Sequence, residues 1–96
     1  MAVQINYISG VYEVKGLLNS QNCVYLESHL LQLLTRSNGV VLSLEKVVDM
    51  DCYAAKAMLA IYEQALRNDQ SLYIIGYKNK CVLNQFSLLQ KNEVLL

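Results

Sequence analysis

A short apolar run, an acidic residue and a helical pattern follow one another between Gly39 and Ala57, and this stretch constrains the fold most. Val40 to Leu44 is almost wholly apolar, and its length is typical of a strand buried on both faces. We expect Glu45 to Met50 to be a connecting loop. Asp51 directly precedes Cys52 to Arg67, where apolar residues recur at helical spacing, so its carboxylate can accept hydrogen bonds from the free N–H groups of a helix start. We expect any functional site to lie there.

The N-terminal part of the chain predicts an antiparallel hairpin. Val3 to Ile8 and Val11 to Lys15 both alternate apolar and polar residues, as half-buried strands do. Ser9-Gly10 between them is a turn signal.

An amphipathic helix is predicted from Gln21 to Arg36, because its leucines recur at spacings of three and four. Asn19, Ser20 and Asn22 are all candidate N-caps for it. Residues 37 to 39, Ser-Asn-Gly, end the helix, and Asn or Gly is available there for a left-handed cap.

The C-terminal part predicts a second buried strand and a last helix. Leu72 to Gly76 has the strand pattern, Asn79 is a candidate cap for a short helix, and Lys91 to Leu96 reads as a tail. The order of elements predicts a single α/β domain over residues 1–96. We expect a four-stranded mixed sheet with an N-terminal antiparallel hairpin and three helices, which cover mainly one face.

Composition excludes several classes of function. Eight basic residues balance eight acidic ones, so the chain has no electrostatic footprint for nucleic acid or an anionic membrane. Zero net charge also gives little protection against self-association, which leaves a homodimer open. A basic-then-apolar leader and a long apolar run are both absent, so we expect no signal peptide and no direct membrane insertion. Three cysteines without close pairing fit a reducing cytoplasm.

The order and spacing of these elements resemble the STAS domain, the family of sulfate transporters and anti-sigma factor antagonists. That family typically has Gly-Glu-Leu-Asp after its hairpin, where this chain has Gly16-Leu17-Leu18-Asn19. Its strand ending Leu-Asp-Leu-Ser matches Leu42-Ser43-Leu44-Glu45, and its Asp-Ser-Ser-Gly-Leu-Gly motif matches residues 51 to 56, Asp-Cys-Tyr-Ala-Ala-Lys. The final helix of the family is similar to Val82 to Leu88. The likeness covers most of the chain.

The signature motif is the part that differs most. In phosphorylatable members the second Ser after the Asp receives phosphate from a partner kinase, and the matching residue here is Tyr53. Cys52 replaces the first Ser, Ala54 replaces the Gly, and Asn19 replaces the carboxylate of the earlier turn. The resemblance therefore implies a protein-binding module whose partner is an anti-sigma factor or a related regulatory kinase. It does not imply the usual serine phospho-switch.

We predict a non-enzymatic regulatory protein, because no His, Ser or Glu pattern stands near Asp51 to form a catalytic pair. Tyr53 lies before the apolar stripe of its helix, so its ring either contacts a partner or covers residues 45 to 50. No cofactor or metal is predicted. The residues expected to bind a protein are Asp51, Cys52, Tyr53, Lys56, Asn19 and Lys78.

Two alternatives remain from the sequence. Small STAS domains also serve as subunits of membrane transporters, where they dock on the ATPase. The second alternative is a thiol switch, since Cys23, Cys52 and Cys81 are equally spaced and each stands near a predicted helix start, where thiol pKa values are lowered. Three thiols on one edge of a sheet could bind zinc or sense oxidation, although structural zinc sites usually bring closely spaced ligand pairs.

Overall fold

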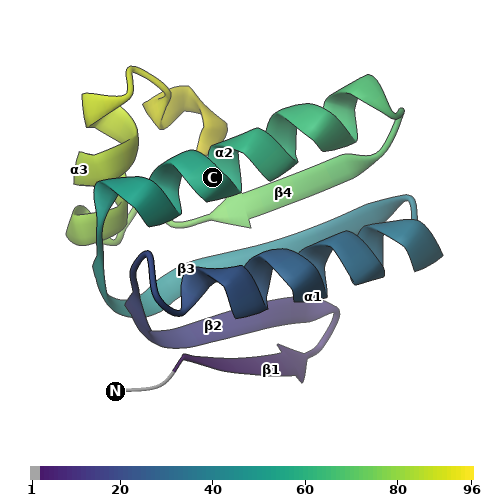
Figure 1. Ribbon diagram of the computed structural model, residues 1–96, viewed down its shortest axis with the longest axis horizontal. Helices are drawn as coiled ribbons and strands as arrows, with labels where there is room; N and C mark the ends of the chain where they lie inside the picture. Colours follow the sequence, from purple (N-terminus) through teal and green to yellow (C-terminus); the bar gives the residue numbers. More distant parts are fainter. Residues whose placement is uncertain (1–2) are drawn as a thin grey trace.

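The computed structural model describes residues 3–96 as a four-stranded sheet with three helices. The strand order is β1-β2-β3-β4, with β1 antiparallel to β2 and the other two pairings parallel (Figure 1). This arrangement confirms the predicted α/β fold class. The elements are β1 (Gln4–Ile8), β2 (Val11–Leu18), α1 (Cys23–Arg36), β3 (Gly39–Met50), α2 (Cys52–Arg67), β4 (Ser71–Ile75), α3 (Lys80–Leu88) and the 3-10 turn η1 (Asn92–Val94).

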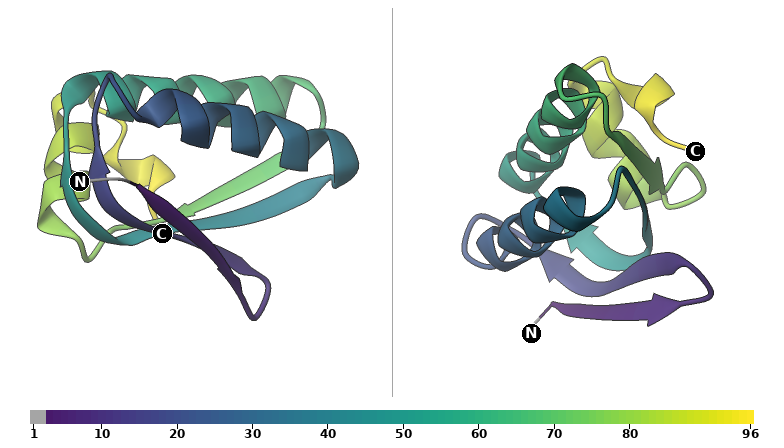
Figure 2. Two further views of the ribbon diagram at one scale, coloured as in Figure 1. Left: turned by 60° about the horizontal axis from the view of Figure 1, so that its bottom comes forward. Right: turned by 90° about the vertical axis from the view of Figure 1, so that its right-hand side faces the viewer.

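The helices α1 and α2 lie side by side on one face of the sheet, and α3 packs at the end of the sheet next to β3 (Figure 2). The core therefore forms between this face and the helices. Leu42 and Ile74 of the central strands are fully buried there, as are Leu30 of α1 and Met58 of α2. Along each strand the alternate residues point to the second face, which α1 and α2 leave uncovered.

The segment from Glu45 to Met50 is a continuation of β3, so the prediction of a connecting loop is wrong. It pairs in parallel with the second half of β2, from Lys15 to Leu18. Sequence periodicity missed it because β3 has an extra residue at two places in this pairing. Such bulges reset the alternation of faces, and Val47 and the strand's last residue are both buried although they stand three positions apart.

The first helix begins at Cys23, two residues later than the predicted Gln21. Asn22 occupies the N-cap position but its side chain makes no capping hydrogen bond. Asn19, which stands before the helix, accepts hydrogen bonds there instead. Its Oδ1 accepts from the backbone N–H of Gln21 (2.9 Å) and of Asn22 (3.1 Å). The turn before the helix is therefore closed by Asn19, one of the three predicted candidates.

The predicted left-handed cap after α1 does not form. Ser37 is the C-cap residue, and its backbone is extended with φ of −144°. Neither Asn38 nor Gly39 has a positive φ. The chain turns back from α1 into β3 through residues 37 and 38 (Figure 1), and the extended backbone of Ser37 makes this reversal without a residue in the left-handed conformation.

The C-terminal residues 91 to 96 are part of the packed domain. Leu95 is buried and forms a parallel bridge with Ile74 of β4. The backbone of Leu96 donates to the Ile74 carbonyl (2.9 Å) and accepts from the N–H of Gly76 (3.0 Å). This segment therefore pairs with the end of β4 on its outer edge, which the reading as a tail did not anticipate.

Candidate functional site

Asp51 caps the start of α2, as predicted. Its Oδ1 accepts a hydrogen bond from the backbone N–H of Ala54 (2.9 Å), and its backbone is extended, as an N-cap residue requires. The second carboxylate oxygen, Oδ2, accepts from the backbone N–H of Ser20 (3.2 Å). The N–H of Asp51 itself donates to the carbonyl of Leu18 (3.0 Å). One residue thus ties the start of α2 to the turn between β2 and α1.

That turn is held by two asparagines that bond to each other. The N–H of Asn19 donates to Oδ1 of Asn22 (3.0 Å), and the N–H of Asn22 donates to Oδ1 of Asn19 (3.1 Å). The Nδ2 of Asn22 also donates to the carbonyl of Leu17 (2.7 Å). The side-chain oxygen of Asn19 is therefore used inside the turn. Beside it lies a hollow of about 90 Å³ lined by Leu17, Leu18, Asn19, Asp49, Met50 and Asp51.

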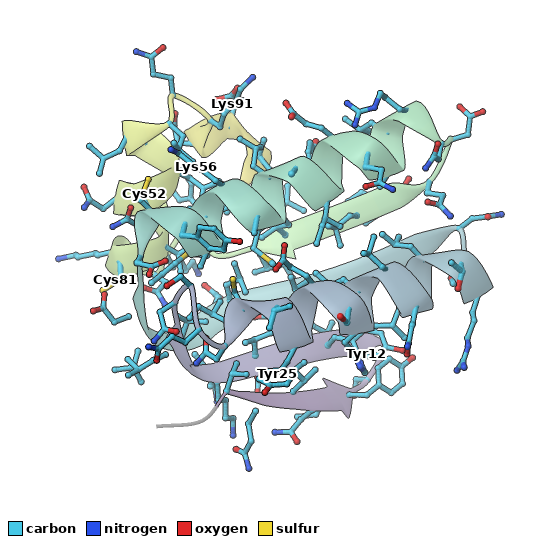
Figure 3. The ribbon with its side chains drawn as sticks, in the orientation of Figure 1. Tyr12, Tyr25, Cys52, Lys56, Cys81 and Lys91 are labelled. Carbon is cyan, nitrogen blue, oxygen red and sulfur yellow. The ribbon has the colours of Figure 1, made fainter. Side chains whose placement is uncertain are left out.

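The first two turns of α2 divide into a buried and an exposed face. Ala54 and Ala55 are fully buried, while Cys52 and Lys56 are exposed (Figure 3). Tyr53 is 56% exposed, so its ring points largely to solvent rather than forming part of the core. The helix start therefore presents an aromatic ring, a thiol and an ammonium group on a backbone fixed by Asp51.

Five of the six predicted binding residues come together in this way, around the start of α2 and the adjoining turn. Lys78 lies in the turn after β4, at the same edge of the sheet, and its side chain is exposed. Within residues 3–96, no hydrogen bond or ion pair joins Lys78 to the other five. Its place beside the other five residues therefore stays a prediction.

Asn79 does more than the sequence indicated. It caps α3 as predicted, since its Oδ1 accepts from the N–H groups of Cys81 (3.0 Å) and Val82 (3.4 Å). Its Nδ2 also donates to three carbonyls of β3, of residues 44, 45 and 47, at 2.8 to 3.2 Å. These carbonyls lie where β3 is bulged. The only sequence signal for this contact is the choice of an amide, which has donors, at a position where Asp or Ser would cap as well.

The three cysteines all stand at helix starts, as predicted, but they do not form one site. Cys23 is fully buried, whereas Cys52 and Cys81 are exposed. Burial, followed by the nearby carboxylate of Glu27 (3.8 Å from Sγ), raises the pKa of the Cys23 thiol. This is opposite to the lowering expected from a helix N-terminus. Among the described residues 3–96, no group of three or more His, Cys, Asp or Glu side chains could hold a metal ion.

Comparison with solved structures identifies the same fold in anti-sigma factor antagonists. The unphosphorylated anti-sigma factor antagonist SpoIIAA aligns with a TM-score of 0.77 at 11% identity, over 99% of this chain and 86% of that chain. An anti-sigma factor antagonist from Mycobacterium paratuberculosis also gives 0.77, at 16% identity over 98% of this chain and 81% of that one. A variant of RsbS from Moorella thermoacetica gives 0.63 at 16% identity, over 90% and 76%.

Comparison by sequence gives the family. No curated protein matches the chain by sequence. In the structure, none of the helices within residues 3–96 has the length and apolar character needed to cross a membrane. The profile of the STAS domain matches residues 1–91. The chain belongs to the STAS domain family.

Proposed function

We propose that this STAS domain is a regulatory module that binds a protein partner through the start of α2. The binding surface consists of Asp51, Cys52, Tyr53 and Lys56 with the turn at Asn19, and Lys78 lies at its rim. The observation that carries the proposal is the exposure of Tyr53 on a helix turn whose inner residues are fully buried.

The chemistry of this surface suits contact with a protein. A tyrosine ring offers a rigid apolar body with a polar tip, and Tyr is enriched among residues that dominate binding energy. Lys56 follows Tyr53 by three positions and therefore lies on the same side of the helix. Asp51 contributes by position, because both oxygens of its carboxylate already accept backbone hydrogen bonds. The backbone below the ring is thus preorganised, which lowers the entropic cost of binding.

The partner we propose is an anti-sigma factor or a related regulatory kinase. The similarity in fold to anti-sigma factor antagonists supports this class of partner. Tyr53 stands at the position where phosphorylatable members of the family have serine, so binding here is controlled by the amount of partner rather than by serine phosphorylation. A non-enzymatic role is consistent with a site whose one carboxylate is engaged by the N–H groups of Ala54 and Ser20.

The test is affinity capture from the native cell, followed by calorimetric titration of the recovered kinase or anti-sigma factor. Tyr53→Arg should weaken binding by at least about tenfold, as loss of an interface tyrosine does. Tyr25→Arg is the matched control, because Tyr25 is 70% exposed on α1. Equal affinities of the two variants would remove Tyr53 from the interface. Recovery of an ATPase would instead favour the transporter subunit, and a bait whose intact mass includes a phosphate would contradict the loss of the switch.

A further inference from the structure

The strand β4 has an open outer edge along its first half. On its inner side it pairs with β3, and on its outer side the C-terminal residues meet only its carboxyl end (Figure 1). There Leu95 forms a bridge with Ile74, and the preceding residues turn away as the 3-10 turn η1. Within residues 3–96, the stretch from Ser71 to Tyr73 therefore has a neighbouring strand on one side only.

The backbone of Leu72 points to this open edge. The N–H of Ser71 donates to the carbonyl of Asn38 (2.8 Å), so Ser71 bonds toward β3. Successive strand residues alternate in direction, so the N–H and carbonyl of Leu72 point outward, as the carbonyl of Ile74 does when it accepts from Leu96 (2.9 Å). The hydrogen bonds from Leu96 reach residues 74, 76 and 77, and none of them reaches Leu72.

A groove of about 320 Å³ runs beside this stretch. Its lining comes from β4, from the last turns of α2 and from the C-terminal segment, namely Tyr62, Leu66, Ser71, Leu72, Tyr73, Glu93, Val94 and Leu96. Leu72 lines the groove but is only 2% exposed, so its outward backbone groups have little contact with bulk water. Backbone groups that are enclosed without a partner are rare and cost free energy. The groove therefore offers one donor and one acceptor that favour a bound partner.

The chemistry of the groove fits an extended peptide segment. Such a segment presents carbonyls and N–H groups at strand spacing, which matches what Leu72 offers. Leu66 and Tyr62 provide an apolar wall for one of its side chains. Glu93 is the charged residue of the lining, and within residues 3–96 its carboxylate forms no ion pair. The groove thus favours an apolar segment with one basic residue.

The C-terminal segment prevents β4 of a second copy from occupying this edge. In an antiparallel pairing centred on Leu72, Ile74 of one copy would lie opposite Gln70 of the other. That place beside Ile74 is already taken by Leu95. The opposite edge of the sheet also differs, because three of the five residues of β1 are exposed and water reaches its backbone. The β4 edge therefore accommodates a short free segment rather than the edge of a second folded sheet.

We propose that the β4 edge at Leu72 binds an extended segment of a partner protein, which adds to the sheet as a short fifth strand. One N–H of the segment donates to the carbonyl of Leu72, and one of its carbonyls accepts from the N–H of Leu72. An apolar side chain packs on Leu66, and a lysine or arginine reaches Glu93. Leu66 lies about 20 Å along α2 from Tyr53, so this site is separate from the proposed function at the start of α2.

The test begins with selection of random dodecapeptides, displayed on phage, against the immobilised whole chain. Calorimetric titration of the synthetic peptides should give dissociation constants between about 10 µM and about 1 mM, because few contacts hold the segment. Leu66→Arg should weaken binding at least about tenfold, since it removes the apolar wall and places a cation beside a basic segment. Tyr53→Arg is the matched control and should change nothing, because Tyr53 is on the same helix and equally exposed.

N-methylated peptides test the backbone pairing itself. At one position, methylation should weaken binding at least about tenfold, because it removes the donor to Leu72 and places a methyl group against the carbonyl. Methylation of an N–H that points to solvent should change little. In a nitrogen-proton spectrum, exchange of the Leu72 amide should slow when the peptide binds, whereas that of Tyr73, which points to β3, should stay as it is.

Four results would overturn the proposal: no selected peptide, binding that no N-methyl position weakens, full affinity in Leu66→Arg, or binding lost in Tyr53→Arg. The last would place the peptide at the start of α2 instead. Slowed exchange of Leu72 in the concentrated chain without peptide would place a second copy at the edge, and would also contradict the proposal. Leu66→Arg should keep its fold, because the leucine is 55% exposed, and circular dichroism checks this.

Discussion

The starts of α2 and α3 look alike in sequence and differ in what they hold together. Each helix is capped by a side chain, Asp51 or Asn79, and each cap is followed closely by an exposed cysteine. Asp51 has only acceptors, and it collects two N–H groups, from Ala54 and from the β2–α1 turn. Asn79 has donors as well, and it collects three carbonyls of β3 in addition to two N–H groups. The residue type at each cap thus matches the neighbouring segment: an acid where that segment offers an N–H donor, and an amide where it offers carbonyl acceptors.

Asn79→Asp should have the largest effect on stability. It keeps the helix cap but removes the donor to three carbonyls and places a carboxylate oxygen against them, which leaves two partly buried acceptors and one exposed acceptor without this partner. We expect a loss of about 2–4 kcal/mol in the free energy of unfolding, measured by urea titration. Asn84→Asp, at an exposed position of α3, is the control and should change little. A loss as small as that of the control would show that the contacts with β3 contribute nothing.

Asp51→Ala should cost less, about 1–2 kcal/mol, because a helix cap and one hydrogen bond to a turn are lost. Asp51→Asn should cost less still, since the amide oxygen can continue to accept from Ala54. The comparison predicts the order Asn79→Asp, Asp51→Ala, Asp51→Asn in decreasing loss, in one series of urea titrations. If Asp51→Asn cost as much as Asp51→Ala, the capping oxygen would not be the group that matters.

Cys23, at the start of α1, is the thiol whose ionisation we expect to change the stability of the protein with pH. Burial and Glu27 raise its pKa, so the thiol ionises at lower pH in the unfolded chain than in the folded one. Its contribution to stability is therefore fully present below the ordinary thiol pKa of 9.0 and is lost as pH rises through the folded pKa. Urea titrations on both sides of that value should show a fall that is absent in Cys23→Ala. Cys52→Ser is the control and should retain the fall.

The difference in burial between Cys23 and the other two cysteines also predicts how fast each thiol reacts. With a chromogenic disulfide reagent, Cys52 and Cys81 should react in a fast phase and Cys23 only as the protein opens, because it is fully buried. Three equally fast thiols would contradict this placement of Cys23.

Tyr53→Arg should have the smallest effect on stability, within about 0.5 kcal/mol, because the ring is largely exposed. It is also the variant expected to weaken partner binding most. Thermal unfolding measured beside the titration separates the two effects. A large drop in melting temperature would mean that the ring packs against the domain, as the second interpretation of Tyr53 held.

The sequence predicted what depends on regular periodicity and local chemistry. The strands and helices, the capping role of Asp51 and that of Asn79 all follow from patterns within a few residues. The second half of β3 was missed because two bulges break the alternation on which strand prediction depends. The contact from Nδ2 of Asn79 to β3 joins segments more than thirty residues apart, so no local sequence pattern could predict it.

The candidate site was predicted in position rather than in detail. Proximity of Asn19 to Asp51 came from the family resemblance, and the structure places the two turns together through the N–H of Ser20. The closing of the β2–α1 turn by Asn19 and Asn22 could not be predicted, since all three polar residues there are equally good caps by type.

The hydrogen bond from Ser20 to Asp51 gives the binding surface a built-in reporter. The amide proton of Ser20 belongs to one segment of the chain and points at a carboxylate of another, thirty-one positions away. Its chemical shift and its rate of exchange with solvent therefore record any movement of the first turn of α2. An experimenter could follow engagement of Tyr53 by a partner through that single signal in the nitrogen-proton spectrum of uniformly nitrogen-15-labelled protein, with no chemical tag or substitution on the contact surface itself.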